Sequence, residues 1–185
     1  RIHFATDGST QSERAQPALG ADFARHGMTI AFNLVTYTGY GLILLALMVF
    51  AERKGHVLSA RTGLIWGVAG FIAVQLAPGI GQPPVLPGAI GSEVGPRQAW
   101  WAFTILCTAL ALALIAFGKG WSALLSVPLL LAPHIIGAPY LDTYYGVAPP
   151  ELSARFAALS FGTALAGWSL LGFFCAWFWT KANDA

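Results

Sequence analysis

Charged residues are scarce in this sequence. Lysine and arginine together number 10, aspartate and glutamate number 8, and the four types make up 10% of its 185 residues. Soluble globular domains carry about 25% charged residues. Hydrophobic residues make up 56% of the chain, and they come in long uninterrupted runs that suit a bilayer better than a water-soluble core. An ordinary soluble domain is therefore excluded.

Cysteine and the common catalytic motifs are also lacking. The two cysteines, Cys107 and Cys175, lie inside apolar runs and form no CxxC pair, so neither a disulfide framework nor a zinc ribbon is indicated. The chain contains no Walker sequence, no haem-attachment CxxCH and no HExxH. We expect no enzymatic activity and no bound cofactor. No basic cluster with interleaved aromatics is present, so nucleic acid is not an expected partner.

What the sequence does have is a series of apolar runs. They cover residues 28–50, 62–77, 100–117, 121–136 and 156–179. About 20 apolar residues cross a bilayer as a helix, and tryptophans gather near the ends of several runs, as an interfacial belt requires. We predict an all-α integral membrane protein with about five transmembrane helices. A polar arm over residues 1–25 would precede a single domain over residues 26–181, with a short polar tail at 182–185.

Glycine and proline predict how these helices begin, end and pack. Gly118 and Gly120 flank Lys119 in a connection short enough to make the third and fourth helices an antiparallel hairpin. Small residues let helices approach closely in lipid. The glycines expected to serve this purpose are Gly63, Gly67, Gly70, Gly162 and Gly167. Pro78 is predicted to end the second helix, because proline cannot continue the helical hydrogen bonding.

Two apolar segments rich in proline and glycine, residues 78–88 and 133–140, are the unusual feature of the chain. Irregular backbone near a membrane is tolerated only where protein buries it or where it lines a wet cavity. With five alternating helices, both segments fall on one membrane face. Lysine and arginine together divide evenly between the two sides, five each. All three lysines lie on the other side, which also has the short loops. We therefore expect the N-terminal arm and the two segments outside, and the C-terminus in the cytoplasm.

Ligand-capable side chains collect on the predicted outer face. They are His26, His134, Glu93, Asp142 and Glu151. Imidazole and carboxylate groups together suit divalent metals such as cobalt, nickel or zinc. His134 is the sharpest candidate, because an ionisable group at the end of an apolar helix is usually functional. The alternative is that these residues never meet. Glu93 could instead form an ion pair with Arg97, four residues later.

The apolar runs contain no Asp, Glu, Lys or Arg. Proton-coupled carriers normally bury acids near the midplane of the membrane, so the absence disfavours a self-contained pump. A neutral polar path along the first helix, over Asn33, Thr36 and Tyr40, stays open. Serine and threonine in such helices more often serve as interhelical hydrogen-bonding groups.

Six motifs in order resemble those of the CbtA family of proposed cobalt transporter subunits. They are HGM (26–28), VTYTGYG (35–41), LAPGIGQPPVLPG (76–88), RQAWW (97–101), PHIIGAP (133–139) and PEL (150–152). The resemblance implies a multi-pass protein of the prokaryotic cytoplasmic membrane that works in cobalt uptake, with Co²⁺ as its substrate. It also implies a small one-helix partner, CbtB, with a histidine motif. Family members usually begin with a further apolar helix, so we expect residues before Arg1.

Two functions follow as hypotheses. The first is a subunit of a cobalt-uptake system with a metal-capture site at the outer face. The second is a structural or accessory subunit of a larger membrane complex, for which the outer loops would be docking surfaces. A stable large complex with unrelated subunits in mild detergent would favour the second.

Overall fold

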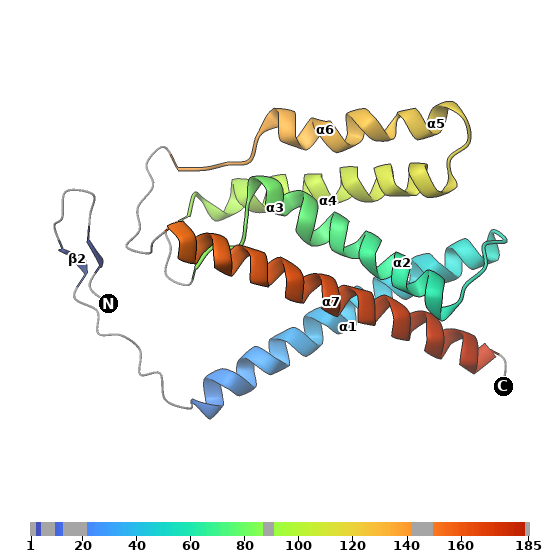
Figure 1. The fold of residues 1–185 in the computed structure, drawn as a ribbon, viewed down its shortest axis with the longest axis horizontal. Helices are drawn as coiled ribbons and strands as arrows, with labels where there is room; N and C mark the ends of the chain where they lie inside the picture. Colours follow the sequence, from blue (N-terminus) through green and yellow to red (C-terminus); the bar gives the residue numbers. More distant parts are fainter. Residues whose placement is uncertain (1–2, 5–9, 13–21, 87–90, 142–149, 184–185) are drawn as a thin grey trace. The chain divides into compact units, whose positions relative to one another are not determined.

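The computed structural model describes residues 3–4, 10–12, 22–86, 91–141 and 150–183, and it is almost entirely helical (Figure 1). The elements are β1 (His3–Phe4), β2 (Thr10–Ser12), α1 (Phe23–Arg53), α2 (Ala60–Phe71), the π-helical segment η1 (Ile72–Leu76), α3 (Ala77–Gly81), α4 (Val94–Phe117), α5 (Trp121–Leu124), α6 (Ser126–Ile136) and α7 (Pro150–Asn183). The short strands β1 and β2 pair antiparallel. The predicted all-α class is confirmed.

Four helical stretches within the described residues are long and apolar enough to cross a membrane. They are Phe23–Arg53, Ala60–Gly81, Val94–Phe117 and Pro150–Asn183. A fifth, Trp121–Ile136, is apolar but shorter. Many large hydrophobic side chains on these helices are exposed, for example Phe32 and Leu106 at 73% and 70%. Such surfaces are stable in lipid and unfavourable in water, so the chain is a multi-pass membrane protein.

The chain divides into two compact units. The first comprises Arg1–Ala15 and Ala69–Ala164, and we call it the hairpin unit. The second comprises Gln16–Val68 and Leu165–Ala185, and we call it the glycine unit. The continuous helix over α2, η1 and α3 contributes to both units, and so does α7.

In the glycine unit, α1 begins earlier than the apolar run at residue 28. Asp22 is its N-cap, and the Asp22 carboxylate accepts a hydrogen bond of 3.0 Å from the backbone N–H of Arg25. An N-cap aspartate satisfies a backbone donor that the helix leaves unpaired. The buried residues of α1 are Gly41, Leu44, Met48 and Ala51. Their three- and four-residue spacing forms one stripe, and Leu44 and Met48 cluster there with Ala176 of α7.

Glycines bring α2 and α7 into direct backbone contact. A Cβ atom added at Gly63 would lie 2.5 Å from the carbonyl oxygen of Gly172, and one at Gly172 would lie 2.6 Å from the backbone nitrogen of Gly67. No side chain fits in these positions. The predicted packing through Gly63 and Gly67 is confirmed, and Gly172 completes it.

The other predicted packing glycines differ from one another. Gly167 faces Tyr37, whose hydroxyl would lie 3.3 Å from an added Cβ atom. Gly70 is half-buried. The expectation for Gly162 is wrong within the described residues, because nothing lies within 4 Å of a Cβ atom there. Gly162 is on an exposed face of α7, which spacing alone does not distinguish from the packed face.

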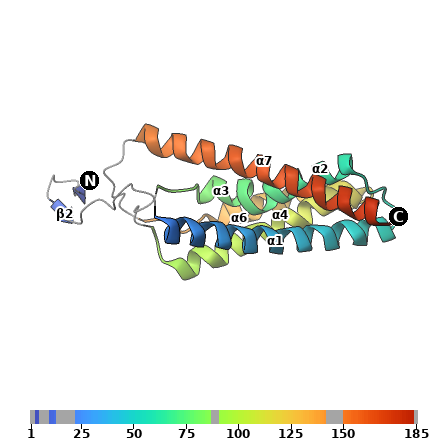
Figure 2. The same ribbon diagram turned by 90° about the horizontal axis from the view of Figure 1, so that it is seen from below.

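The hairpin unit takes its name from α4 and α6, which lie side by side and antiparallel (Figures 1 and 2). Gly120 adopts a positive φ of 56° in the turn, a conformation that suits glycine. The predicted hairpin is confirmed, although its second arm is interrupted at Leu125, between α5 and α6. The face of α4 that is buried carries Trp100, Thr104, Cys107, Thr108 and Ala111.

Neither Pro78, which was expected to end a helix, nor Pro133, which was not, terminates the helix that contains it. Helix continues through η1 into α3 and ends at Gly81, so the prediction that Pro78 ends it is wrong. Pro78 directly follows the π-helical segment, in which the Ala77 N–H bonds to the carbonyl oxygen of Ile72, so the residue without an N–H falls where the helical hydrogen bonding changes register. Pro133 lies inside α6 and is buried, and the helix ends at Ile136, before Gly137 with its φ of 85°. The irregular backbone therefore begins at Gly137.

Candidate functional site

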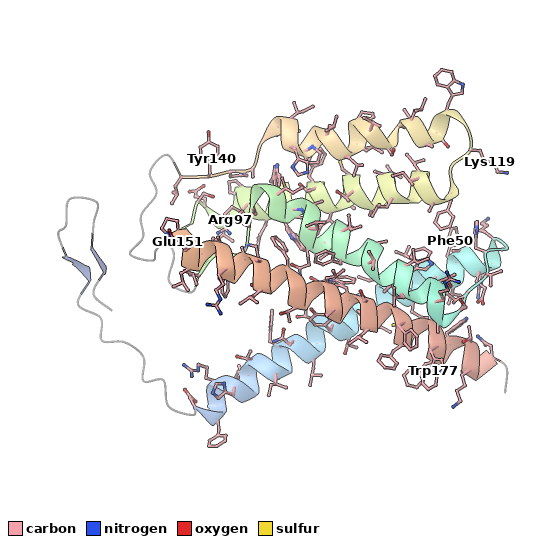
Figure 3. All side chains as sticks on the ribbon, viewed as in Figure 1. Phe50, Arg97, Lys119, Tyr140, Glu151 and Trp177 are labelled. Carbon is pink, nitrogen blue, oxygen red and sulfur yellow. The ribbon has the colours of Figure 1, made fainter. Side chains whose placement is uncertain are left out.

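The two predicted loops meet at one end of the hairpin unit. The hydroxyl of Ser92, just before α4, donates a hydrogen bond of 3.1 Å to the carbonyl oxygen of Pro139, after α6. A Cβ atom at Gly81, the last residue of α3, would lie 2.8 Å from the Cβ of Ala138. Figure 3 shows Tyr140, Arg97 and Glu151 toward this end of the unit and Lys119 at the other. We call the end of the hairpin unit where Ser92 meets Pro139 the loop end.

A tryptophan organises the hairpin below the loop end. Trp100 is only 6% exposed, and its indole N–H donates a hydrogen bond of 2.9 Å to the carbonyl oxygen of Pro133. Its ring also meets the imidazole of His134 edge-on, with centroids 6.0 Å apart. His134 is half-buried. The proline before it therefore supplies the acceptor that fixes Trp100, and Trp100 in turn forms one wall around the histidine.

The remaining predicted ligands are dispersed. Glu93 is exposed at the N-cap of α4 and makes no capping hydrogen bond with its side chain. Glu151 is exposed in the first turn of α7. His26 is exposed on α1, in the glycine unit. Asp142 lies outside the described residues. Within the described part of the chain, no three His, Cys, Asp or Glu residues gather closely enough to hold a metal ion.

Arg97 is placed differently from the expected ion pair with Glu93. Helix α4 begins only at Val94, and the backbone N–H of Arg97 donates to the carbonyl oxygen of Glu93 at 3.4 Å. The guanidinium lies against Gly91, where an added Cβ atom would be 2.6 Å from one of its terminal nitrogens. The absence of a side chain at Gly91 thus makes room for the arginine.

An open recess of about 270 Å³ adjoins Arg97 at the loop end. Its polar lining comes from Arg97, Gln75 of η1 and Gln82, and its apolar walls include Trp101 and Phe161. A second recess, of about 250 Å³, shares Gln82, Arg97 and Trp101 with the first. Neither Gln75 nor Gln82 was predicted to be part of a site. The available signal was one uncharged amide just before an apolar, proline-rich stretch and another in its middle.

These features define a multi-pass helical membrane protein with an irregular, partly polar loop end. The chain belongs to the CbtA family, described as "Probable cobalt transporter subunit (CbtA)", whose pattern matches residues 3–180. The resemblance drawn from the six motifs is thereby confirmed over nearly the whole chain. No curated protein and no solved structure matches this chain significantly.

Proposed function

We propose that this protein is a subunit of a cobalt-uptake system in a prokaryotic cytoplasmic membrane, and that it acts as a transport component and not as an enzyme. The family match over residues 3–180 carries this proposal, and the four apolar helices long enough to span a membrane support it. The distribution of lysines favours an N-terminal arm outside the cell and a cytoplasmic C-terminus.

Metal capture at the outer face is assigned in this proposal to His134, Glu93, Glu151, Asp142 and His26. His134 is half-buried, and Glu93 and Glu151 are exposed in the same unit. Imidazole and carboxylate are suitable ligands for a borderline divalent ion such as Co²⁺. Because no group of three ligands gathers among the described residues, the proposed site holds its substrate through few protein ligands at a time.

Sparse coordination fits a transported ion. A transport site must bind its ion well enough to admit it and weakly enough to release it. Water or a second subunit would complete the coordination shell. We propose a small one-helix membrane protein as that second subunit, with the lipid bilayer as the other partner of the exposed apolar helices.

The test is cobalt accumulation by cells that express the full-length protein with its small partner. His134→Ala is expected to lower uptake about tenfold, the scale by which loss of groups around a metal site weakens binding. Glu93→Gln and His26→Ala are expected to lower it less. His56→Ala is the matched control, because His56 lies in the connection between α1 and α2, outside the proposed set.

Each variant is compared at equal membrane abundance. If His134→Ala takes up cobalt as well as His56→Ala does, the assignment of His134 is wrong. Uptake no higher than in empty-vector cells for every form of the protein would contradict transport itself.

The alternative function is a structural or accessory subunit of a larger membrane complex. One observation favours it, namely that the apolar runs contain no Asp, Glu, Lys or Arg, the residues that usually mark an ion pathway within a membrane. In that case the chain migrates in mild detergent as part of a stable large assembly with unrelated subunits, and none of the histidine variants changes cobalt accumulation. A transport subunit would instead lose uptake on His134→Ala whatever the size of its assembly.

A further inference from the structure

The recess beside Arg97 has a chemical character opposite to that of a metal site. Its described lining holds one cationic side chain, that of Arg97, and the amides of Gln75 and Gln82, with no carboxylate. The adjoining recess adds the amide of Gln98 and again no acid. A guanidinium repels a bare divalent cation. An anion is the ligand that this lining suits.

The arginine has a neighbour at its base and open space for its tip. The side-chain nitrogen Nε2 of Gln82 donates to the backbone carbonyl oxygen of Arg97 across 3.5 Å, and the guanidinium lies beside Gly91, which has no side chain. Arg97 is half-buried, so its charge is less screened than that of a fully exposed side chain. It also sits in the first turn of α4, where the helix dipole favours negative charge.

The remaining walls are apolar. Trp101, Phe161 and Val85 border the recess, together with Pro78, Pro83 and Pro84. The recess lies where two membrane-crossing stretches, Ala60–Gly81 and Val94–Phe117, respectively end and begin. Helix ends are the level at which lipid headgroups contact a membrane protein, and tryptophan is common there. A ligand with a negative group and an apolar continuation fits both kinds of wall.

We propose that this recess binds the phosphate group of an anionic phospholipid, with Arg97 as the principal contact and Gln75 and Gln82 as additional donors. Arginine is well suited to phosphate because its planar guanidinium can donate two parallel hydrogen bonds. Trp101 and Phe161 would border the glycerol and upper acyl chains. The site goes beyond cobalt uptake, because it requires no metal.

Native mass spectrometry of the full-length protein, delipidated in detergent, tests the proposal by titration with phosphatidylglycerol. Wild type is expected to bind one such lipid at least about tenfold more tightly than Arg97→Gln, since hydrogen bonds to charged groups are among the strong ones. Arg155→Gln is the matched control. Arg155 is an exposed arginine of α7 in the same unit, and it does not line the recess. It is expected to bind like wild type.

Two further variants separate binding from folding. Arg97→Lys keeps the charge and loses the paired donors, so its affinity is expected to fall between those of wild type and Arg97→Gln. Gly91→Ala places a methyl group where the guanidinium lies and is expected to weaken binding, while Gly95→Ala, with open space around it, is expected to leave binding unchanged. If Arg97→Gln does not fold, this glycine pair carries the test.

Three results would overturn the proposal. The first is that Arg97→Gln binds phosphatidylglycerol as tightly as wild type. The second is an equal loss of affinity in Arg155→Gln, which would indicate only general surface charge. The third is Arg97-dependent binding of millimolar inorganic phosphate without any Arg97-dependent binding of the lipid, which would assign the recess to soluble phosphate. Phosphatidylcholine, which has no net charge, is expected to bind more weakly than phosphatidylglycerol.

Discussion

Within each of the two units, the helices pack through a different kind of contact. In the glycine unit, α2 and α7 touch backbone to backbone at Gly63, Gly67 and Gly172. In the hairpin unit, α4 and α6 are joined by side chains, above all by the buried indole of Trp100 and its hydrogen bond to Pro133. A backbone contact leaves no room for adjustment. Side-chain contacts tolerate gaps, and the same unit contains one in the recess beside Arg97, which η1, α4 and Phe161 of α7 help to line.

The largest loss of stability is expected when a side chain is added at the backbone contact between α2 and α7. Gly67→Val would place its Cβ against the carbonyl group of Trp168. Neither backbone can move without separating the helices, so we expect a loss of about 3 kcal/mol or of the folded protein altogether. Gly162→Val is the control, because it makes the same substitution at a position on α7 where nothing lies within 4 Å of the added Cβ atom. Its effect on helix propensity is the same. Thermal unfolding in detergent measures both, and equal stability of the two variants would contradict the close packing.

Trp100→Phe tests the hairpin unit with an intermediate expected effect. The substitution removes the indole N–H, leaves the carbonyl oxygen of Pro133 without that donor and creates a small cavity. We expect a loss of about 2 kcal/mol. The control is Trp101→Phe. Trp101 is the next residue in the chain, but its side chain is 38% exposed, so this variant is expected to change stability by only about 0.5 kcal/mol. Denaturation of both in the same detergent checks this. The role of Trp100 would be disproved if its variant were as stable as that of Trp101.

The smallest loss of stability is expected where α7 contacts the C-terminal end of α1. The indole N–H of Trp179 donates a hydrogen bond of 2.9 Å to a carboxylate oxygen of Glu52, and this links α7 to the end of α1. Trp179→Phe removes the bond at a half-buried site and is expected to cost about 1 kcal/mol. Trp177→Phe, on the same helix and more exposed, is the control. A chemical-denaturation midpoint that drops equally in both variants would exclude a specific contribution from the Glu52 bond.

Local patterns predicted much of this fold, because they depend on residues close together in the chain. The Gly63 and Gly67 spacing predicted a small-residue face, and the short connection around Lys119 predicted the hairpin. The π-helical segment and the continuation past Pro78 were not predicted. They depend on how a whole helix redistributes its backbone hydrogen bonds, which single residues do not reveal.

The site was less predictable for the same reason. Arg97 and Gln82 are separated by 15 residues, and Phe161 is far from both in sequence, so only the tertiary fold brings them to one recess. The two proline-rich segments were predicted only to share a membrane face, and the fold brings them into contact, since a Cβ atom at Gly81 would lie 2.8 Å from that of Ala138. The ligand set from His26 to Glu151 stays a prediction, because sharing a membrane face does not ensure contact between side chains.

The π-helical segment Ile72–Leu76 has a consequence for chain length. A π turn holds one more residue than the α-helix it interrupts. In a regular α-helix that extra residue would rotate Ala77–Gly81 by about 100° relative to Ala69–Phe71 and turn Gly79 away from Phe161, a wall of the recess. The wider turn absorbs the residue, so deleting one residue within Ile72–Leu76 would restore a regular α-helix and leave Gly79 on its present face. Among related proteins, loss of one residue in this stretch is therefore expected to preserve the recess, whereas loss of one residue between this stretch and Gly79 is expected to reshape it.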